Sequence, residues 1–151
     1  MKLFKNSVDN FYKWVHGSEF VELDDIDVLE DPVRPELDLE WRKSYSRKIY
    51  GLTYKNNIEG IICIAYCNDV PESVRELDLI SQNAHLLENI NTAVAYTVWS
   101  RKRGAGKEIM SRLLEFLKNK PEITKLVTPV SYTHLRAHET PEHLVCRLLL
   151  E

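Results

Sequence analysis

Residues 92–118 constrain the fold of this chain more than any other segment, because they join a buried strand, a glycine-rich basic turn and an amphipathic helix. The run from Thr92 to Trp99 is mostly β-branched, aromatic and small, which is typical of a buried strand. In the helix after the turn, Ile109, Leu113 and Leu117 recur at a spacing that places them on one apolar face. The segment therefore predicts a strand whose end leads, through a tight turn, into a helix packed on the same sheet.

The turn itself combines cationic side chains with glycine. Arg101, Lys102 and Arg103 precede Gly104 and Gly106. Glycine adopts positive φ angles and lets a ligand approach the backbone closely, and the free N–H groups at a helix N-terminus attract anions. The turn and the start of the helix therefore predict a binding site for a diphosphate group.

Two other phosphate-binding motifs share this outline and are excluded by single residues. A nucleotide P-loop needs G-x4-G-K-[ST], whereas Glu108 stands in the hydroxyl position here and Arg101 in the position of the first glycine. A dinucleotide fingerprint needs a third small residue, where this chain has Ile109. The remaining pattern is R-x-x-G-x-G, formed by Arg101, Gly104 and Gly106.

This pattern, placed after a buried strand, resembles the pyrophosphate loop of the GCN5-related N-acetyltransferase (GNAT) superfamily. In that superfamily the motif follows the fourth strand and opens the third helix, and the backbone of the strand pairs with the pantetheine arm of coenzyme A. The resemblance implies acetyl-CoA or another acyl-CoA as co-substrate, with its thioester near residues 98–100. The cofactor-binding residues that it implies are Val98, Trp99, Ser100, Arg101, Lys102, Arg103, Gly104, Ala105, Gly106 and Lys107.

Residues 66–128 are also similar in sequence to the acyltransferase-like domain of malonyl-CoA decarboxylases. The similar stretches are Asp69–Ser73, Thr92–Val98 and Leu126–Thr128. The chain departs from those enzymes at the turn, where Arg-Lys-Arg replaces a neutral loop that contains glutamine. The catalytic histidine of that family, and the tyrosine that protonates the thiolate in acetyltransferases, would both lie beyond residue 128, so the resemblances assign no catalytic residue.

Other segments predict the rest of the fold. Ser46–Tyr54 alternates and Gly60–Tyr66 is apolar throughout, which indicates an antiparallel hairpin whose second arm lies mid-sheet. Helices are expected over residues 5–16 and from Asp69 to about Ser81. Together with the resemblance, these elements predict an α/β (α+β) fold with a GNAT-like, mixed and mostly antiparallel twisted sheet, helices on both faces and a truncated C-terminal end.

The end of the chain has a different character. Residues 129–151 resemble a phrase that recurs at the ends of unrelated predicted proteins, as translated sequencing-adaptor read-through. We therefore expect an incomplete acyl-CoA-binding domain over residues 1–128 and a non-native tail over residues 129–151. His134 and His138 have a spacing known from zinc sites, but the glutamate of a zincin is missing between them, and we expect no metal.

Composition excludes several functional classes. No stretch approaches the roughly 18 uninterrupted apolar residues of a membrane span, and the N-terminus turns polar at once, so we expect a cytoplasmic protein with no membrane partner. A net charge of -3 argues against nucleic acid as a partner. The cysteines Cys63, Cys67 and Cys146 form no even framework, so no disulfide is required.

An acidic run precedes the predicted hairpin. Nine acidic residues face a single basic one, Arg34, between Phe20 and Glu40. We expect an irregular connector with a solvated surface, and attraction of a cationic amine is the alternative.

Five side chains near the predicted site have more than one interpretation. Tyr96 and Thr97 are expected to point to opposite faces of their strand, so that only one faces the substrate cleft, with Tyr96 in the core. Trp99 either lines the acyl pocket or caps the sheet. Glu88 is the nearest upstream acid that could serve as general base, but on a polar loop it is expected to be a solvated surface carboxylate. His85 is a lone histidine in the same polar stretch and is expected to be a bystander rather than a catalytic residue.

The expected function is transfer of an acetyl group from acetyl-CoA to the amine of a small-molecule or protein acceptor, by direct attack in a ternary complex. Two alternatives remain open, a malonyl-CoA decarboxylase-like lyase and a CoA-binding module without catalysis. The sequence predicts neither the acceptor, nor the acyl chain, nor the oligomeric state.

Overall fold

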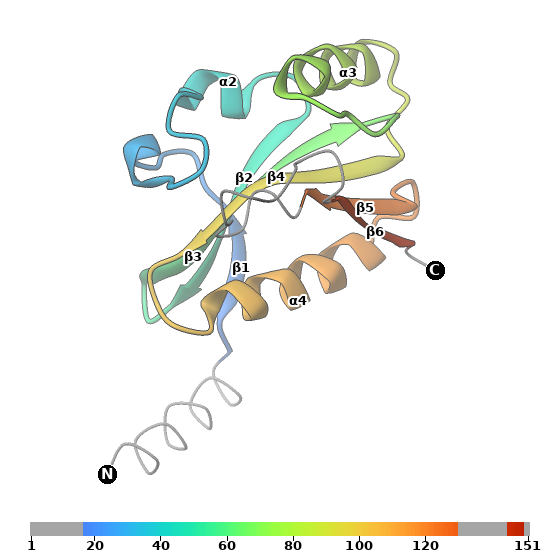
Figure 1. The fold of residues 1–151 in the computed structure, drawn as a ribbon. Coiled ribbons are helices and arrows are strands. Elements are labelled where there is room, and N and C mark those ends of the chain that lie inside the picture. The colour runs from blue at the N-terminus through green and yellow to red at the C-terminus, as the bar shows by residue number, and fades with distance from the viewer. Residues whose placement is uncertain (1–16, 130–144, 150–151) are drawn as a thin grey trace, which may run out of the picture.

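A six-stranded sheet with helices on both faces organises the chain (Figure 1). The computed structural model describes residues 17–129 and 145–149, so the helix expected over residues 5–16 lies outside the described residues. The elements are, in chain order, β1 (Glu19–Glu22), the 3-10 helix η1 (Val28–Glu30), α2 (Leu39–Lys43), β2 (Arg47–Tyr54), β3 (Asn57–Cys67), α3 (Val74–Leu86), β4 (Thr92–Ser100), α4 (Ala105–Lys118), β5 (Lys125–Pro129) and β6 (Val145–Leu149).

The strands lie side by side in chain order, and only β4 and β5 are parallel neighbours. The predicted hairpin is confirmed, because β2 and β3 are antiparallel and are joined at Lys55 and Asn56, whose φ angles of 51° and 64° are left-handed. β3 lies mid-sheet as predicted and is buried from Glu59 to Cys67. Since parallel strands need a crossover connection, α4 serves as the crossover from β4 to β5. The mixed, mostly antiparallel sheet predicted from the sequence is therefore confirmed.

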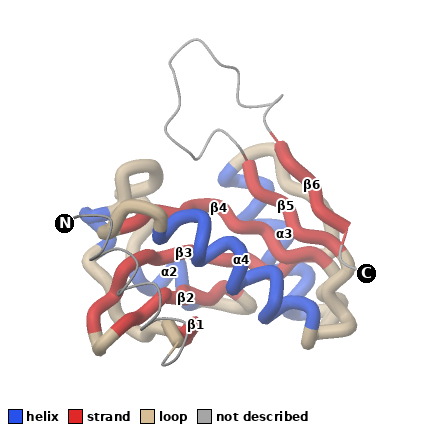
Figure 2. The backbone as a smooth tube through the Cα atoms, turned by 90° about the horizontal axis from the view of Figure 1, so that it is seen from below, coloured by secondary structure: helices blue, strands red, loops and turns tan. Residues whose placement is uncertain are grey.

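The two faces of the sheet carry different helices, as Figures 1 and 2 show. The helix α4 covers one face with its buried residues Ala105, Ile109, Leu113 and Leu117, which join a core cluster with Ile62 and Ile64 of β3. On the opposite face, α2 and α3 cover a second cluster that contains Leu77, Tyr96 and Trp99. The prediction of helices on both faces is confirmed, and the apolar face predicted for α4 is the one that packs on the sheet.

The helix expected to begin at Asp69 begins later and runs further. Ser73 caps α3, and its hydroxyl accepts a hydrogen bond from the Glu76 N–H at 3.1 Å, whereas the Asp69 carboxylate accepts from the N–H of the adjacent Val70. The helix continues past Ser81 to Leu86, because Ser81 and Ala84 are buried on the side that faces the sheet. Burial on the sheet thus extends the helix into a stretch that looked polar in the sequence.

Residues 145–149 form β6, which pairs with β5 in antiparallel register. Part of the expected tail therefore lies beside the sheet, while the proposed boundary near residue 128 stays a prediction. Within residues 17–129 and 145–149, no helix is long and apolar enough to cross a membrane.

Candidate functional site

The fourth strand, which leads into the glycine-rich turn, contains a β-bulge. Cys63 of β3 pairs with Thr97, but the next residue, Ile64, pairs with Ala95, so Tyr96 is the extra residue. A bulge interrupts the alternation of side chains and re-aims the residues that follow it. The expectation that Tyr96 and Thr97 point to opposite faces is therefore wrong.

Both side chains lie under the connector and α2. Tyr96 is fully buried with its ring 5.5 Å from the ring of Trp41, so its predicted place in the core is confirmed. The Thr97 hydroxyl, also buried, donates a hydrogen bond of 2.9 Å to the Asp31 carboxylate. Neither side chain is directed towards the opposite face, where α4 lies.

The edge of β4 that faces β5 is only partly paired. The two strands are in register from Thr92 to Val94, and the remaining six residues of β4, residues 95–100, have no partner on that edge among the described residues. Backbone N–H and C=O groups on such an edge can pair with an extended ligand, much as a peptide adds a strand to a sheet. The unpaired stretch ends where the basic turn begins.

Gly104 shapes that turn. It is the N-cap residue of α4 and has a φ angle of 88°, a left-handed conformation that strains residues with a Cβ. A Cβ added at either Gly104 or Gly106 would meet nothing within 4 Å, so the space outside both glycines is open. Only Gly104 uses the conformational freedom expected of the two, since Gly106 already lies within the helix.

The N-terminus of α4 presents unused hydrogen-bond donors. The Ala105 N–H donates to the Lys102 carbonyl at 3.1 Å. The N–H groups of Gly106 and Lys107 donate to no acceptor in residues 17–129 or 145–149. These two donors lie at the positive end of the helix dipole, where an anion is stabilised. The local geometry therefore suits an anionic ligand.

The four cations around the turn fall into two pairs. Arg101 and Lys102 are engaged by carboxylates, because the Arg101 guanidinium forms a two-point contact with Glu30 and the Lys102 Nζ lies 3.3 Å from an oxygen of Glu59. Arg103 and Lys107 are exposed and make no ion pair within the described part of the chain. Two cations and two N–H groups without a partner among the described residues thus lie within residues 103–107.

The contact between Glu30 and Arg101 is close. The Arg101 Nε and Nη2 atoms lie 2.5 Å and 2.9 Å from the two carboxylate oxygens. The hydrogen bond from Arg101 lowers the pKa of Glu30, and the same bond raises the pKa of Arg101. Both groups therefore stay charged over the whole neutral range.

The acidic connector is not merely a solvated surface, and this is a correction. Asp31 is buried and forms an ion pair of 2.9 Å with the fully buried Arg42. Arg42 also donates to the backbone carbonyls of Arg34 and Leu37. An isolated buried charge is very costly, so Asp31 and Arg42 require each other. No local pattern in the sequence indicates this pair, because Asp31 lies in the connector and Arg42 lies eleven positions later, in α2.

The other predicted cofactor-binding residues lie on different sides of the end of β4. Val98 is half-buried against the cluster under α4, whereas Trp99 is buried in the opposite cluster, and its Nε1 atom lies 3.3 Å from a Glu30 oxygen. Ser100 is exposed at the end of β4, and Ala105 packs against β3 at Gly60. Trp99 thus lies beneath the connector, while the other residues surround the turn and the helix N-terminus.

His85 and Glu88 both lie at the surface. His85 is exposed, and its Nδ1 atom lies 2.7 Å from the Ser46 hydroxyl. Glu88 is also exposed. In the described residues, no group of three or more His, Cys, Asp or Glu side chains could hold a metal ion.

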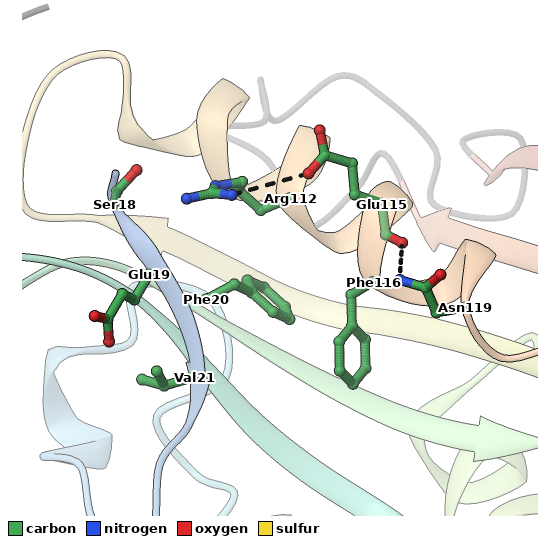
Figure 3. Close-up of a pocket in the computed structure, with 8 residues that line it drawn as sticks. All are labelled: Ser18, Glu19, Phe20, Val21, Arg112, Glu115, Phe116 and Asn119. Atoms are coloured by element: carbon green, nitrogen blue, oxygen red, sulfur yellow. Dashed lines mark hydrogen bonds and ion pairs between the residues drawn. The ribbon is translucent and has the colours of Figure 1, made fainter. Parts of the chain in front are cut away.

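A pocket of about 400 Å³ lies elsewhere on α4, between its later turns and β1 (Figure 3). Phe20 and Phe116, whose ring centroids are 5.4 Å apart, form its apolar part, and Arg112 and Glu115 lie at its polar side. None of the residues that line it belongs to the turn. The pocket and the candidate anion site are therefore separate features of the same helix.

The fold matches those of solved structures over most of the chain. Malonyl-CoA decarboxylase from Agrobacterium vitis matches with a TM-score of 0.61 at 18% identity, over 83% of this chain and 37% of that chain. The enzyme from Cupriavidus metallidurans matches with a TM-score of 0.54 at 17% identity, over 83% of this chain and 34% of that one. The chain thus spans about a third of the length of these proteins. The likeness to malonyl-CoA decarboxylases expected from the sequence is confirmed for the fold.

A weaker match is a GNAT family acetyltransferase from Elizabethkingia anophelis with acetyl-CoA bound. It has a TM-score of 0.44 at 16% identity, over 74% of this chain and 63% of that chain. No protein-family model matches the sequence, and no curated protein matches it either.

Proposed function

We propose that the chain binds an acyl-coenzyme A, with the pyrophosphate at the N-terminus of α4. The observation that carries this proposal is that residues 103–107 contain four donors without a partner in residues 17–129 or 145–149: the N–H groups of Gly106 and Lys107 and the side chains of Arg103 and Lys107. Charge-assisted hydrogen bonds from such donors are the strong interactions that hold phosphate groups. The open space outside Gly104 and Gly106 leaves room for the ligand to approach the backbone.

The pantetheine arm would lie along the unpaired edge of β4. Its amides are the groups that an exposed strand edge can bind, and the edge runs through residues 95–100 up to the turn. A ligand held at both places would have its thioester near Val98, with its acyl group towards the middle of the strand. The coenzyme would thus be fixed at two points, and fixation of that kind supplies the positioning on which acyl transfer depends.

The reaction that we propose is transfer of the acyl group, acetyl in the simplest case, to an amine of a small molecule or protein. The amine nitrogen attacks the thioester carbonyl, the carbon–sulfur bond breaks, and the coenzyme A thiolate leaves and takes up a proton. The connector supports an amine acceptor, since the exposed Asp27 caps the 3-10 helix that ends at Glu30, and the Glu30 carboxylate lies 3.3 Å from the Trp99 Nε1 atom. No residue of this chain is assigned as general base or acid.

A malonyl-CoA decarboxylase-like lyase is the second candidate. The fold likeness to malonyl-CoA decarboxylases, with TM-scores of 0.61 and 0.54, favours it. Such a reaction would use the same coenzyme site, so the two candidates differ only in what happens at the acyl group.

Calorimetry with coenzyme A and acetyl-CoA tests the shared part of the proposal. We expect binding by the unchanged chain, a sharp loss on Gly104→Asp and on the double change Arg101→Glu with Arg103→Glu, and no loss on Arg75→Glu, an exposed residue of α3. Unchanged affinity in both loop variants would contradict the proposal.

Product analysis then separates the reactions. Release of free coenzyme A that requires an added amine supports N-acyl transfer, and release of carbon dioxide from malonyl-CoA supports the lyase. Binding of acetyl-CoA and malonyl-CoA without turnover identifies a non-catalytic coenzyme A-binding module.

A further inference from the structure

Glu30 contacts Arg101 in the way that a phosphate group would. Its two carboxylate oxygens accept hydrogen bonds from Nε and Nη2 of one guanidinium, at 2.5 Å and 2.9 Å. This fork arrangement is the geometry in which arginine binds both carboxylates and phosphates. Glu30 therefore accepts the hydrogen bonds that Arg101 could otherwise donate to a diphosphate.

The connector keeps Glu30 in that place. The next residue, Asp31, is buried in its ion pair with Arg42 and in its hydrogen bond with Thr97 of β4. Trp99, two residues further along β4, adds a contact of 3.3 Å from its Nε1 atom to Glu30. Because Asp31 is fixed on the same strand that carries the turn, the Glu30 carboxylate has a high effective concentration next to Arg101.

The contact is nevertheless open to exchange. The Arg101 and Glu30 side chains are 41% and 33% exposed, whereas those of Arg42 and Asp31 are at 0%. Water and salt weaken an ion pair with that much exposure, so a ligand with a higher negative charge can displace it at small cost. The buried pair holds the connector, and the exposed pair can change partners.

We propose that Glu30 is an internal competitor for the coenzyme A pyrophosphate, which must displace its carboxylate to engage Arg101. The inference rests on the proposed function and adds a determinant of affinity to it. In the free protein Arg101 is neutralised by Glu30, and in the complex the pyrophosphate takes its place. Arg103, Lys107 and the N–H groups of Gly106 and Lys107 would form the part of the site that is available before this exchange.

The substitution Glu30→Gln tests the competition with little other change. Glutamine has the same size and can still accept a hydrogen bond from the Trp99 Nε1, but it carries no charge to hold Arg101. Because an exposed ion pair contributes little, we expect calorimetry to show coenzyme A binding about two- to fivefold tighter than in the unchanged chain. Pantetheine, which has no pyrophosphate, should bind both proteins equally.

Two matched variants separate competition from a general effect of charge. Glu22→Gln removes the same charge from another exposed ion pair, that of Glu22 with Lys48, and should leave coenzyme A affinity unchanged. In an Arg101→Gln background, Glu30→Gln should also have no effect, since there is no guanidinium left to compete for.

The possible results distinguish this inference from the proposal on which it rests. Absence of coenzyme A binding by the unchanged chain overturns both. Binding that Glu30→Gln leaves equal or weakens overturns only the competition, and so does equal tightening with and without Arg101. Tightening that requires Arg101 and is absent with pantetheine supports the inference.

Discussion

Asp31 and Arg42 form an ion pair of 2.9 Å between two side chains that solvent does not reach. Asp31 precedes α2 and Arg42 lies within it, and the hydrogen bond from Thr97 links the pair to the middle of β4. The pair thus attaches the acidic connector to the strand that leads into the candidate site. Loss of either partner would leave the other as an unpaired buried charge.

We therefore predict that Asp31→Ala lowers the free energy of unfolding by about 3–5 kcal/mol. The double substitution Asp31→Leu with Arg42→Met should cost less than this single change, because it leaves no unpaired charge. Urea denaturation followed by tryptophan fluorescence measures both. Glu22→Gln, which breaks an exposed ion pair, is the control and should change stability by less than about 1 kcal/mol. A loss from Asp31→Ala as small as that of the control would contradict this account.

The fold was largely predictable from local pattern. The hairpin around Lys55 and Asn56, the strand from Thr92 and the apolar face of α4 each follow from the order of apolar and turn residues, which acts over a few positions. The end of α3 was not predictable in this way, since the burial of Ala84 depends on contact with the sheet.

The candidate site was predictable only in part. The glycines and cations of the turn are contiguous, so their spacing indicated an anion site. The carboxylate that occupies Arg101 is distant in sequence, since Glu30 lies 71 positions before it, and local spacing could not predict this contact. The bulge at Tyr96 depends on how β4 pairs with β3, and this register cannot be predicted from the residues of β4 alone.

The buried thiols give a second prediction. Burial raises the pKa of Cys63 to about 11 and that of Cys67 to about 12, so both stay protonated at neutral pH. Since the thiolate is the reactive form, neither should react with a thiol reagent at pH 8 in the folded protein, and both should react after denaturation in guanidinium. A Cys146→Ser background removes the third cysteine from the measurement. Rapid labelling of the folded protein would show that these thiols are accessible.

The same shifts predict how stability depends on pH. The folded pKa of each thiol lies above the ordinary value of 9.0, so the folded state holds its protons more tightly than the unfolded state does. The thiol contribution to stability is complete below pH 9 and is lost as the pH rises towards 11 and 12. Denaturation midpoints at pH 8 and pH 10 should therefore differ less in Cys63→Ala than in the unchanged chain. An equal difference in both would contradict the assignment to Cys63.

The division of the four cations gives a further prediction. Arg103 and Lys107 have no ion-pair partner in residues 17–129 or 145–149, whereas Lys102 is paired with Glu59. We expect Arg103→Gln with Lys107→Gln to weaken coenzyme A binding at least tenfold, and Lys102→Gln to weaken it less. The double variant should also show a shallower dependence of affinity on salt, because fewer charges remain to be screened. Calorimetry at two salt concentrations measures both effects. An equal loss of affinity in the two variants would show that an existing ion pair does not decide which cation binds the ligand.

Substitutions at Gly106 test ligand binding without disturbing the fold, because its surroundings are open and its φ angle is not left-handed. It lies in the first turn of α4, where alanine is a better helix former than glycine, and an added Cβ would touch nothing within 4 Å. Gly106→Ala should therefore leave the free energy of unfolding unchanged or raise it by up to about 1 kcal/mol.

If the pyrophosphate lies against this turn, the same methyl group narrows the space outside the N–H groups of Gly106 and Lys107, so coenzyme A affinity should fall and should fall further for Gly106→Val. Gly104→Ala is the contrasting variant, since its φ angle of 88° makes it destabilising in the absence of any ligand. A Gly106→Val protein that is folded and binds coenzyme A as tightly as the unchanged chain would place the ligand elsewhere.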